Sequence, residues 1–224
     1  MSAYNHQITV ISDVICPWCY IGKNRLDIAL KKLRQDYDVH VLWNAFELNP
    51  TMPNKGMERK AYLDYKFGSR RTAEKIYKNI ENVAVEDGLK IAFEHILKTP
   101  NTRLSHKLIA SLDCPGKQNK LVDVLFEAYF IHGKDIGDEK VLSEIARALQ
   151  LSQDSLNSND TTDTLVVSQE ERALELGVTG VPAFVYNDRL LFSGAQSPET
   201  IYLSLKQALS LIHISEPTRQ AEIS

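Results

Sequence analysis

The chain contains 224 residues, of which 43% are hydrophobic and 25% charged, and its formal net charge is −3. This composition is typical of a soluble globular protein and favours neither nucleic acid nor a membrane as a partner. There is no run of about 18 apolar residues, and the first residues lack a basic segment before an apolar core, so we expect no membrane span, no signal peptide and a cytoplasmic protein.

The N-terminal residues predict a strand, a helix and a second strand. Residues 7–14 (QITVISDV) are rich in Ile and Val, as expected of a buried strand. Residues 22–35 carry Leu26, Leu30 and Leu33 at helical spacing, and residues 39–46 (VHVLWNAF) again favour a strand. A right-handed crossover through the helix makes the two strands parallel.

Beyond Pro50 and Pro53, helix signals dominate as far as residue 176. Most of these segments carry apolar residues three and four positions apart. The predicted helices cover residues 58–67, 70–86, 102–112, 118–132, 139–150 and 162–176.

The C-terminal part predicts a hairpin and a closing helix. Residues 181–186 and 189–192 favour strands on either side of Asn187-Asp188, a dipeptide suited to a two-residue hairpin turn. Ser197 followed by Pro198 is a typical helix start, with Ser at the N-cap and Pro in the first turn.

This order of elements, βαβ, helices and ββα, indicates an α/β fold. A single four-stranded mixed sheet is expected, because neither half can bury its apolar faces alone. We expect residues 1–50 and 178–208 to form one discontinuous domain and residues 51–177 to form a helical insertion. Leu209–Arg219 (LSLIHISEPTR) resembles the translation of a sequencing adapter, so residues 209–224 are expected to be an artefactual tail.

The tetrapeptide Cys16-Pro17-Trp18-Cys19 stands between the first strand and the first helix. Cysteines three residues apart on one helix face can form a disulfide with little backbone movement. The N–H groups at a helix start stabilise a thiolate, which lowers the pKa of such cysteines from about 8.5 to roughly 3.5–7.5. We therefore predict a redox pair in which Cys16 is the nucleophile and Cys19 the resolving thiol.

Half of a zinc site and a pair of inert buried thiols are the alternatives for these cysteines. A structural zinc ion takes four ligands. Beyond the pair the sequence offers only Cys114 and scattered histidines, with no second CxxC and no HxxxH spacing. No metal site is expected, and Cys114 is interpreted as an unpaired thiol.

Further motifs accompany the CxxC pair, and together they give a resemblance to a known family. Over about residues 6–208 the chain resembles DsbA-like thioredoxin-fold proteins, and more narrowly the FrnE-type dithiol–disulfide oxidoreductases and isomerases. The motifs that carry this resemblance are Asp13 to Gly22 (DVICPWCYIG), Asn101-Thr102 with His106, Tyr129-Phe130 through Gly133 to Ile136, and Gly177 to Phe184 with Gly194-Ala195-Gln196.

The resemblance implies a thioredoxin fold with a large all-helical insertion. It also implies a cis Val181–Pro182 bond that packs against Cys16 and Cys19 and leaves the Val181 backbone free to pair with a substrate segment. The same superfamily contains glutathione-dependent enzymes, such as 2-hydroxychromene-2-carboxylate isomerase and the kappa-class glutathione transferases. These typically carry a serine at the position of Cys16, so a pair of thiols favours the oxidoreductase over the isomerase or transferase.

One residue departs from the pattern of the family. Many thioredoxin-fold enzymes have a buried acid six residues before the first cysteine, where it helps to move the proton of the resolving thiol, but Val10 stands there in this chain. The proton acceptor for Cys19 is therefore left open. Asp13 lies closer in sequence, and we expect it to cap the helix or bond to a loop rather than to take part in catalysis.

Four further residues are candidates for substrate contact beside Val181 and Pro182. Trp18 is expected to be exposed and to offer an apolar surface next to the nucleophile, and Pro17 stiffens the helix start. Asn101 is interpreted first as a helix cap, with His106 on the polar side of that helix; the functional alternative is that both line a cleft above Cys16.

We therefore predict a cytoplasmic thiol–disulfide oxidoreductase that acts on disulfide-containing proteins or peptides or on small thiols. No bound cofactor is expected, although glutathione is a candidate co-substrate. Whether the protein works as oxidant, reductase or isomerase depends on its redox potential, and the oligomeric state, with a homodimer as one option, is left open.

Overall fold

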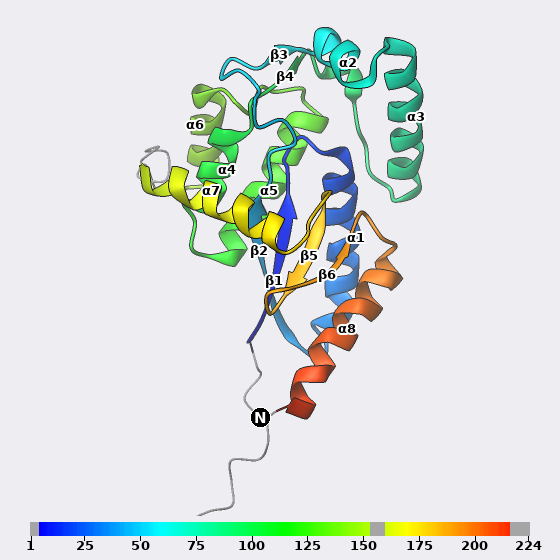
Figure 1. The fold of residues 1–224 in the computed structure, drawn as a ribbon, viewed down its shortest axis with the longest axis vertical. Coiled ribbons are helices and arrows are strands. Elements are labelled where there is room, and N and C mark those ends of the chain that lie inside the picture. Colours follow the sequence, from blue (N-terminus) through cyan, green and yellow to red (C-terminus); the bar gives the residue numbers. More distant parts are fainter. Residues whose placement is uncertain (1–4, 153–159, 216–224) are drawn as a thin grey trace, which may run out of the picture.

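A four-stranded mixed sheet forms the centre of the computed structural model, which describes residues 5–152 and 160–215 (Figure 1). Its strand order is β2-β1-β5-β6, in which β1 and β2 are parallel and the other neighbours antiparallel. The expected thioredoxin-type sheet of βαβ and ββα halves is confirmed. The strands are β1 (Asn5–Ser12), β2 (Asp38–Ala45), β5 (Ala183–Tyr186) and β6 (Arg189–Ser193).

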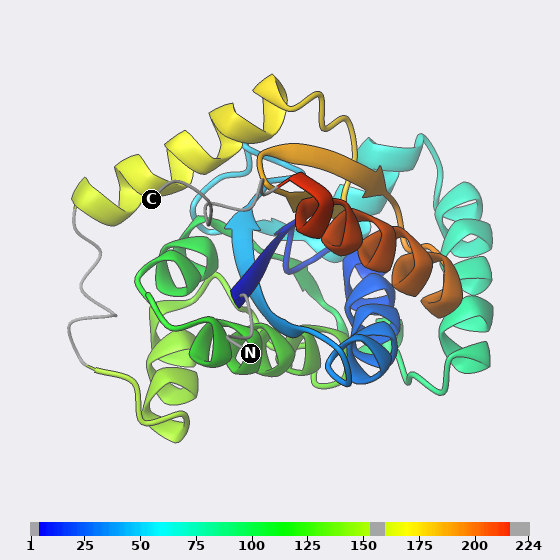
Figure 2. The same ribbon diagram turned by 90° about the horizontal axis from the view of Figure 1, so that it is seen from below.

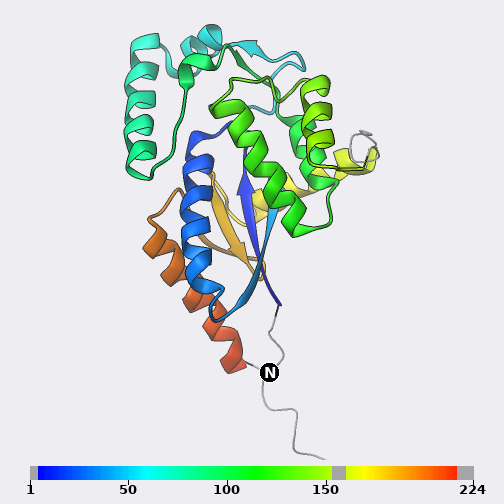
Figure 3. The same ribbon diagram turned by 180° about the vertical axis from the view of Figure 1, so that it is seen from behind.

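Helices surround this sheet and account for most of the residues between its two halves (Figures 1 and 3). They are α1 (Pro17–Leu33), α2 (Arg59–Phe67), α3 (Arg70–Glu86), α4 (Arg103–Ala110), α5 (Pro115–Phe130), α6 (Glu139–Ala148), α7 (Asp160–Glu175) and α8 (Pro198–Ser215), with a 3-10 turn at Phe93–His95.

The alternating side chains of β1 and β5 build two different cores. Ile8, Val10 and Phe184 point into the larger core, which also contains residues of α1, α5 and α8. Ile11 and Val185 point to the other side, where they meet Ala173 of α7. The sheet is therefore covered on both faces. Helix α7 runs along one side of the sheet in the view from below (Figure 2).

The β5–β6 connection has the tight turn that its sequence predicts. Asn187 and Asp188 both have positive φ, at 48° and 56°. A two-residue turn with φ > 0 at both positions has the twist that antiparallel strands require, and Asn and Asp tolerate that conformation better than other side chains. Register here is slightly irregular between Phe184 and Val185.

Two details differ from the sequence prediction. Helix α1 begins at Pro17, five residues before the predicted start at Gly22, because proline fits the first position of a helix. The leucine spacing that predicted this helix begins only at Leu26. A short antiparallel pair, β3 (Met57–Glu58) with β4 (Lys98–Thr99), was not predicted. Two-residue strands carry too few side chains to show a period of two.

The division into domains at residues 50/51 and 177/178 stays a prediction. Helix α8 continues through Ser215, so part of the expected artefactual tail is helical, and residues 216–224 of that tail lie outside the described residues. Among the helices that the structure describes, none combines the length and the apolar character that a membrane crossing requires.

Gly22 lets helix α1 approach the segment that precedes β5. A Cβ atom at Gly22 would lie 2.7 Å from Cγ of Pro182, closer than packed carbon atoms approach.

We therefore expect Gly22→Ala to lower the free energy of unfolding by about 1–3 kcal/mol, measured by urea denaturation. In α5, a Cβ at Gly116 would meet no described atom within 4 Å. Gly116→Ala is the matched control, and it should leave stability unchanged or raise it by up to about 1 kcal/mol. Equal stabilities of the two variants would contradict the predicted contact.

Candidate functional site

Cys16 and Cys19 lie at the start of helix α1. Cys16 is the N-cap residue and Pro17 the first helical residue, so the Cys16 sulfur is next to the unpaired N–H groups of the first turn. The N–H groups of Cys19 and Tyr20 donate to the Cys16 carbonyl at 3.0 and 3.2 Å. Both cysteines are free thiols, with Cys16 5% and Cys19 1% exposed.

The segment before β5 lies directly beside Cys16. The Cys16 thiol donates to the Val181 carbonyl, with 3.8 Å between sulfur and oxygen. The Val181–Pro182 bond is cis, which confirms what the family resemblance implies. The Gly194 N–H donates to the Pro182 carbonyl at 2.7 Å and so links this segment to the residue after β6. Hydrogen bonds therefore connect Cys16 to the segment before β5, and this segment to Gly194.

The Cys19 thiol is almost completely buried. Burial raises the pKa of the Cys19 thiol well above its ordinary value, and the hydrogen bond and the charge of Cys16 act in the same direction. The Ser12 hydroxyl and the Asp13 N–H oppose this rise, because each can donate a hydrogen bond to the Cys19 thiolate once that thiolate forms. At neutral pH Cys19 therefore keeps its proton, and a reaction that uses it as a nucleophile needs a proton acceptor.

The position that holds a buried acid in related enzymes is apolar here. Val10 is 1% exposed and belongs to the larger core. The buried carboxylate of this region is Asp13, which accepts from the N–H of Ile15 at 3.3 Å and from the N–H of Leu48 at 2.8 Å. Asp13 thus bonds to loops, as the sequence predicted, while the N-cap of α1 is Cys16.

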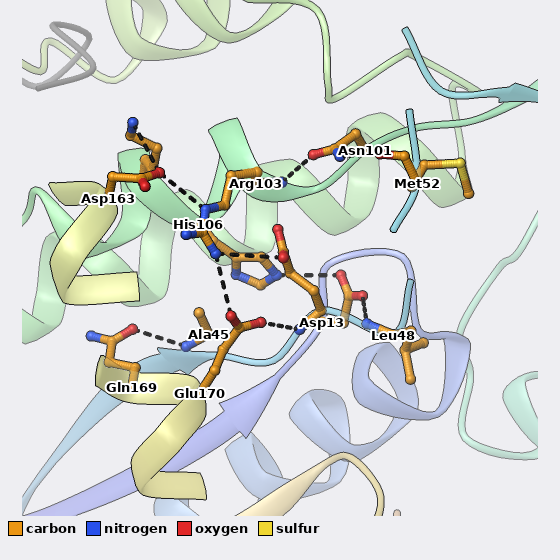
Figure 4. A network of polar contacts seen from close by, with 12 residues as sticks. Asp13, Ala45, Leu48, Met52, Asn101, Arg103, His106, Asp163, Gln169 and Glu170 are labelled. Atoms are coloured by element: carbon orange, nitrogen blue, oxygen red, sulfur yellow. Dashed lines mark hydrogen bonds and ion pairs between the residues drawn. The ribbon is translucent and has the colours of Figure 1, made fainter. Parts of the chain in front are cut away.

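Trp18 and His106 are more buried than the sequence predicted. Trp18 is only partly exposed, because its ring packs between the larger core and a cluster around Ile21 and Ile80 of α1 and α3. His106 is 3% exposed, and its Nε2 lies 3.4 Å from Oδ1 of Asp13 (Figure 4). The expectation that His106 occupies the polar side of its helix is wrong, because the buried face of α4 carries polar side chains such as Ser105.

Asn101 serves mainly as a structural link. Its side-chain N–H donates to the Met52 carbonyl at 2.7 Å, and its Oδ1 accepts from the N–H of Arg103 at 2.9 Å, which is the capping role that the sequence predicted. Asn101 also lines a polar cleft of about 680 Å³ together with Lys55, Lys107 and others. Asn101 and His106 thus line two different cavities, and Cys16 is not among the described residues that line either one.

Arg103 ties helices α4 and α7 to the end of strand β2. Its guanidinium lies 3.5 Å from Glu47, 3.1 Å from Asp163 and 3.2 Å from Glu170 (Figure 4). Glu170 in turn accepts from the N–H of Glu47 at 2.9 Å. Burial, and then the charge of Glu170, raise the pKa of Glu47, whereas Arg103 lowers it. The network fixes helix α4, which carries His106, relative to the end of strand β2.

Two residues, Ser12 beside Cys19 and Glu47 in the network of Arg103, were not among the sequence candidates. Ser12 ends β1 and is 5% exposed, yet a serine at a strand end has no distinctive sequence signal. Glu47 follows β2, and its contacts with Arg103 and Glu170 join segments that are distant in the chain. Cys114 is exposed, and within residues 5–152 and 160–215 no group of three or more His, Cys, Asp or Glu side chains is arranged to hold a metal ion.

Comparison with known proteins gives matches over nearly the whole chain. Residues 7–206 match the family model described as the DSBA-like thioredoxin domain. The chain is 27% identical over 189 residues to the uncharacterized protein YwbO of Bacillus subtilis (strain 168), covering 82% of this chain and 88% of that one.

Among solved structures, the probable DsbA oxidoreductase SCO1869 of Streptomyces coelicolor superposes with a TM-score of 0.81 at 28% identity, over 98% of this chain and 94% of the other. The cytosolic disulfide reductase DsbM of Pseudomonas aeruginosa, solved with GSH, superposes with a TM-score of 0.62 at 16% identity, over 91% and 99%. The second likeness concerns the fold alone.

The environment of Cys19 predicts how its titration depends on Cys16. In a Cys114→Ser background, which removes the exposed thiol, Cys16→Ala should lower the pKa of Cys19, because both contributions of Cys16 raise it. Burial is the largest cause of the shift and persists, so this pKa should stay above the ordinary value of about 8.5. Thiolate ultraviolet absorbance against pH measures it, with Cys16→Ala/Cys19→Ala as the blank. A Cys19 that titrates at or below the ordinary value would contradict this account of its burial.

Proposed function

Because this chain belongs to the DSBA-like thioredoxin domain family, we propose that it is a thiol–disulfide oxidoreductase that works through Cys16 and Cys19. The observation that carries the proposal is the position of the two thiols: one caps a helix beside the Val181 carbonyl, and the other lies one turn deeper in the same helix. This arrangement supports a nucleophile that meets the substrate and a second thiol that the substrate does not reach.

The two half-reactions assign a distinct role to each cysteine. Cys16, as the thiolate, attacks one sulfur of a substrate disulfide; a Cys16–substrate disulfide forms and the other substrate sulfur leaves as a thiolate. Cys19 then loses its proton and attacks the Cys16 sulfur. The Cys16–Cys19 disulfide forms, the substrate sulfur leaves, and two electrons have passed from the protein to the substrate. The same steps in reverse oxidise a dithiol substrate.

The Val181 carbonyl supports an extended peptide as substrate. In the free protein this carbonyl accepts from the Cys16 thiol. Once Cys16 is in a mixed disulfide it has no S–H to donate, and the carbonyl is released to accept from a backbone N–H of the substrate. Pro182, Pro17 and the partly exposed Trp18 complete the proposed contact surface. Direct contact of Asn101 with substrate stays a prediction.

Glutathione is the small thiol that we propose as a co-substrate. The thioredoxin-fold protein DsbM was solved with it, and the glutathione-dependent isomerases and transferases that the sequence also resembles use it. A serine in those enzymes can only bond to the glutathione thiolate, whereas Cys16 can form a disulfide with it. This difference favours the oxidoreductase; a cytoplasmic location and the oligomeric state stay predictions.

Reduction of insulin and refolding of scrambled ribonuclease test the proposed function. We expect wild-type protein to be active in at least one assay, and Cys16→Ser to lose at least about 100-fold in rate because the nucleophile is gone. Cys19→Ser should instead accumulate a mixed disulfide that mass spectrometry detects. Cys114→Ser is the matched control and should behave as wild type, because Cys114 is exposed and stands outside the pair.

Inactivity of the wild type in both assays would count against the oxidoreductase. A hydroxychromene-type substrate with glutathione provides the other outcome: rapid turnover that survives Cys16→Ser and Cys19→Ser would assign the isomerase class instead. Titration of the pair against glutathione then gives the redox potential and the direction of the reaction.

A further inference from the structure

A small cavity lies between the sheet and helices α4 and α5, and its lining includes Ser12, which interacts with Cys19. Its volume is about 10 Å³, and one water molecule needs about 10–15 Å³ on this measure. Most of its lining is apolar, but Ser12, Asn44 and His106 contribute polar side chains. The residues that line it are Ser12, Val14, Trp43, Asn44, His106, Ile109 and Val122.

Two of the lining side chains have a buried polar atom without a partner. Oγ of Ser12 and Nε2 of His106 are each shielded from solvent and have no aligned hydrogen bond to any residue that the structure describes. The contact of His106 Nε2 with Oδ1 of Asp13 is 3.4 Å long and is not aligned as a hydrogen bond. A buried hydroxyl or ring nitrogen left unpaired costs about 1–3 kcal/mol, so two of them around one cavity indicate a shared partner.

We propose that this cavity binds one water molecule that joins Ser12 to His106, and that Ser12, the water and His106 form the path that removes the proton from Cys19. The inference rests on the proposed function, because the proton is released when Cys19 attacks the mixed disulfide. It supplies the acceptor that the apolar Val10 does not provide. Neither Ser12 nor His106 touches the substrate, and both act through the water.

The path conserves protons and electrons. The Cys19 S–H gives its proton to Oγ of Ser12, the Ser12 hydroxyl passes its own proton to the water, and the water passes one to Nε2 of His106. Ser12 and the water are unchanged, and His106 becomes an imidazolium. The electron pair left on the Cys19 sulfur forms the bond to Cys16, while the bond between Cys16 and the substrate breaks and its electron pair leaves with the substrate sulfur.

Charged groups surround the ring of His106. Asp13 is 0% exposed, and its Oδ1 faces the nitrogen that receives the proton. Glu47 is the second acidic group that interacts with His106. Arg103 is one cation of the same network, and Lys107, 3.3 Å from Asp163, is another. A buried carboxylate close to an imidazole stabilises the imidazolium. Asp13 is therefore a positioning residue, since its two oxygens are fixed by the N–H groups of Ile15 and Leu48.

The two half-reactions can be separated in one stopped-flow trace with a substoichiometric aromatic disulfide, 5,5′-dithiobis(2-nitrobenzoate), in a Cys114→Ser background. Attack by Cys16 releases the first thionitrobenzoate, and attack by Cys19 on the mixed disulfide releases the second. We expect His106→Gln and Ser12→Ala to slow the second phase at least about 10-fold at neutral pH and to move its pH profile upward, with the first phase within about twofold of wild type.

Two control variants distinguish proton transfer from packing. Ile109→Val loosens the same cavity without removing a polar atom, and His132→Gln removes an exposed histidine, so both should leave the second phase within about twofold of the background protein. A second phase that keeps its rate and its pH profile in both Ser12→Ala and His106→Gln would overturn the proton path. Absence of both phases in the background protein would overturn the proposed function itself.

A crystal structure of the reduced protein tests the water site independently of kinetics. Electron density for a water within hydrogen-bonding distance of Oγ of Ser12 and Nε2 of His106 is the expected result. A cavity without such density, with both atoms unpaired or bonded elsewhere, would overturn the proposal even if the protein exchanges disulfides.

Discussion

The buried Asp13 carboxylate is the interaction on which the rest of the site depends. One oxygen accepts from the turn that leads into the cysteines and the other from the segment after β2, while His106 of α4 lies against it. Three parts of the chain that are distant in sequence therefore meet at a single side chain that water does not reach. A buried carboxylate is tolerated only when it is hydrogen-bonded in this way. Loss of any partner leaves part of the cost of removing the carboxylate from water uncompensated.

The outer network extends this arrangement to the helices. Arg103 bonds to Glu47, Asp163 and Glu170, so that α4 and α7 are fixed to the end of the strand that neighbours β1. Gln169 of α7 adds a bond to the N–H of Ala45. The helices between the two halves of the sheet are thus part of the support of Asp13 and of the loop that leads into the cysteine pair.

The fold could be predicted from the sequence because its strong signals are local. The Asn187-Asp188 turn, Pro198 at the start of α8 and the spacing of leucines in α1 each report the backbone conformation of their own segment. The cysteine pair at the start of α1 was recognisable for the same reason. The contacts of Ser12 and His106 were not, because a polar residue at a strand end or on a buried helix face looks like a solvent-facing one until its neighbours are known. His106 and Asp13 are far apart in the chain, and only the packing of α4 on β2 brings them together.

Gly22 offers a way to compare this protein with others that carry two cysteines three residues apart. Its missing side chain sets how closely the first helix and the segment at Pro182 approach each other. A chain with a larger residue three positions after its second cysteine must hold that segment farther from the helix, or replace its proline by something smaller. The identity of this one position therefore reports how far the first helix lies from the segment that precedes the third strand of the sheet, without any structure of that chain.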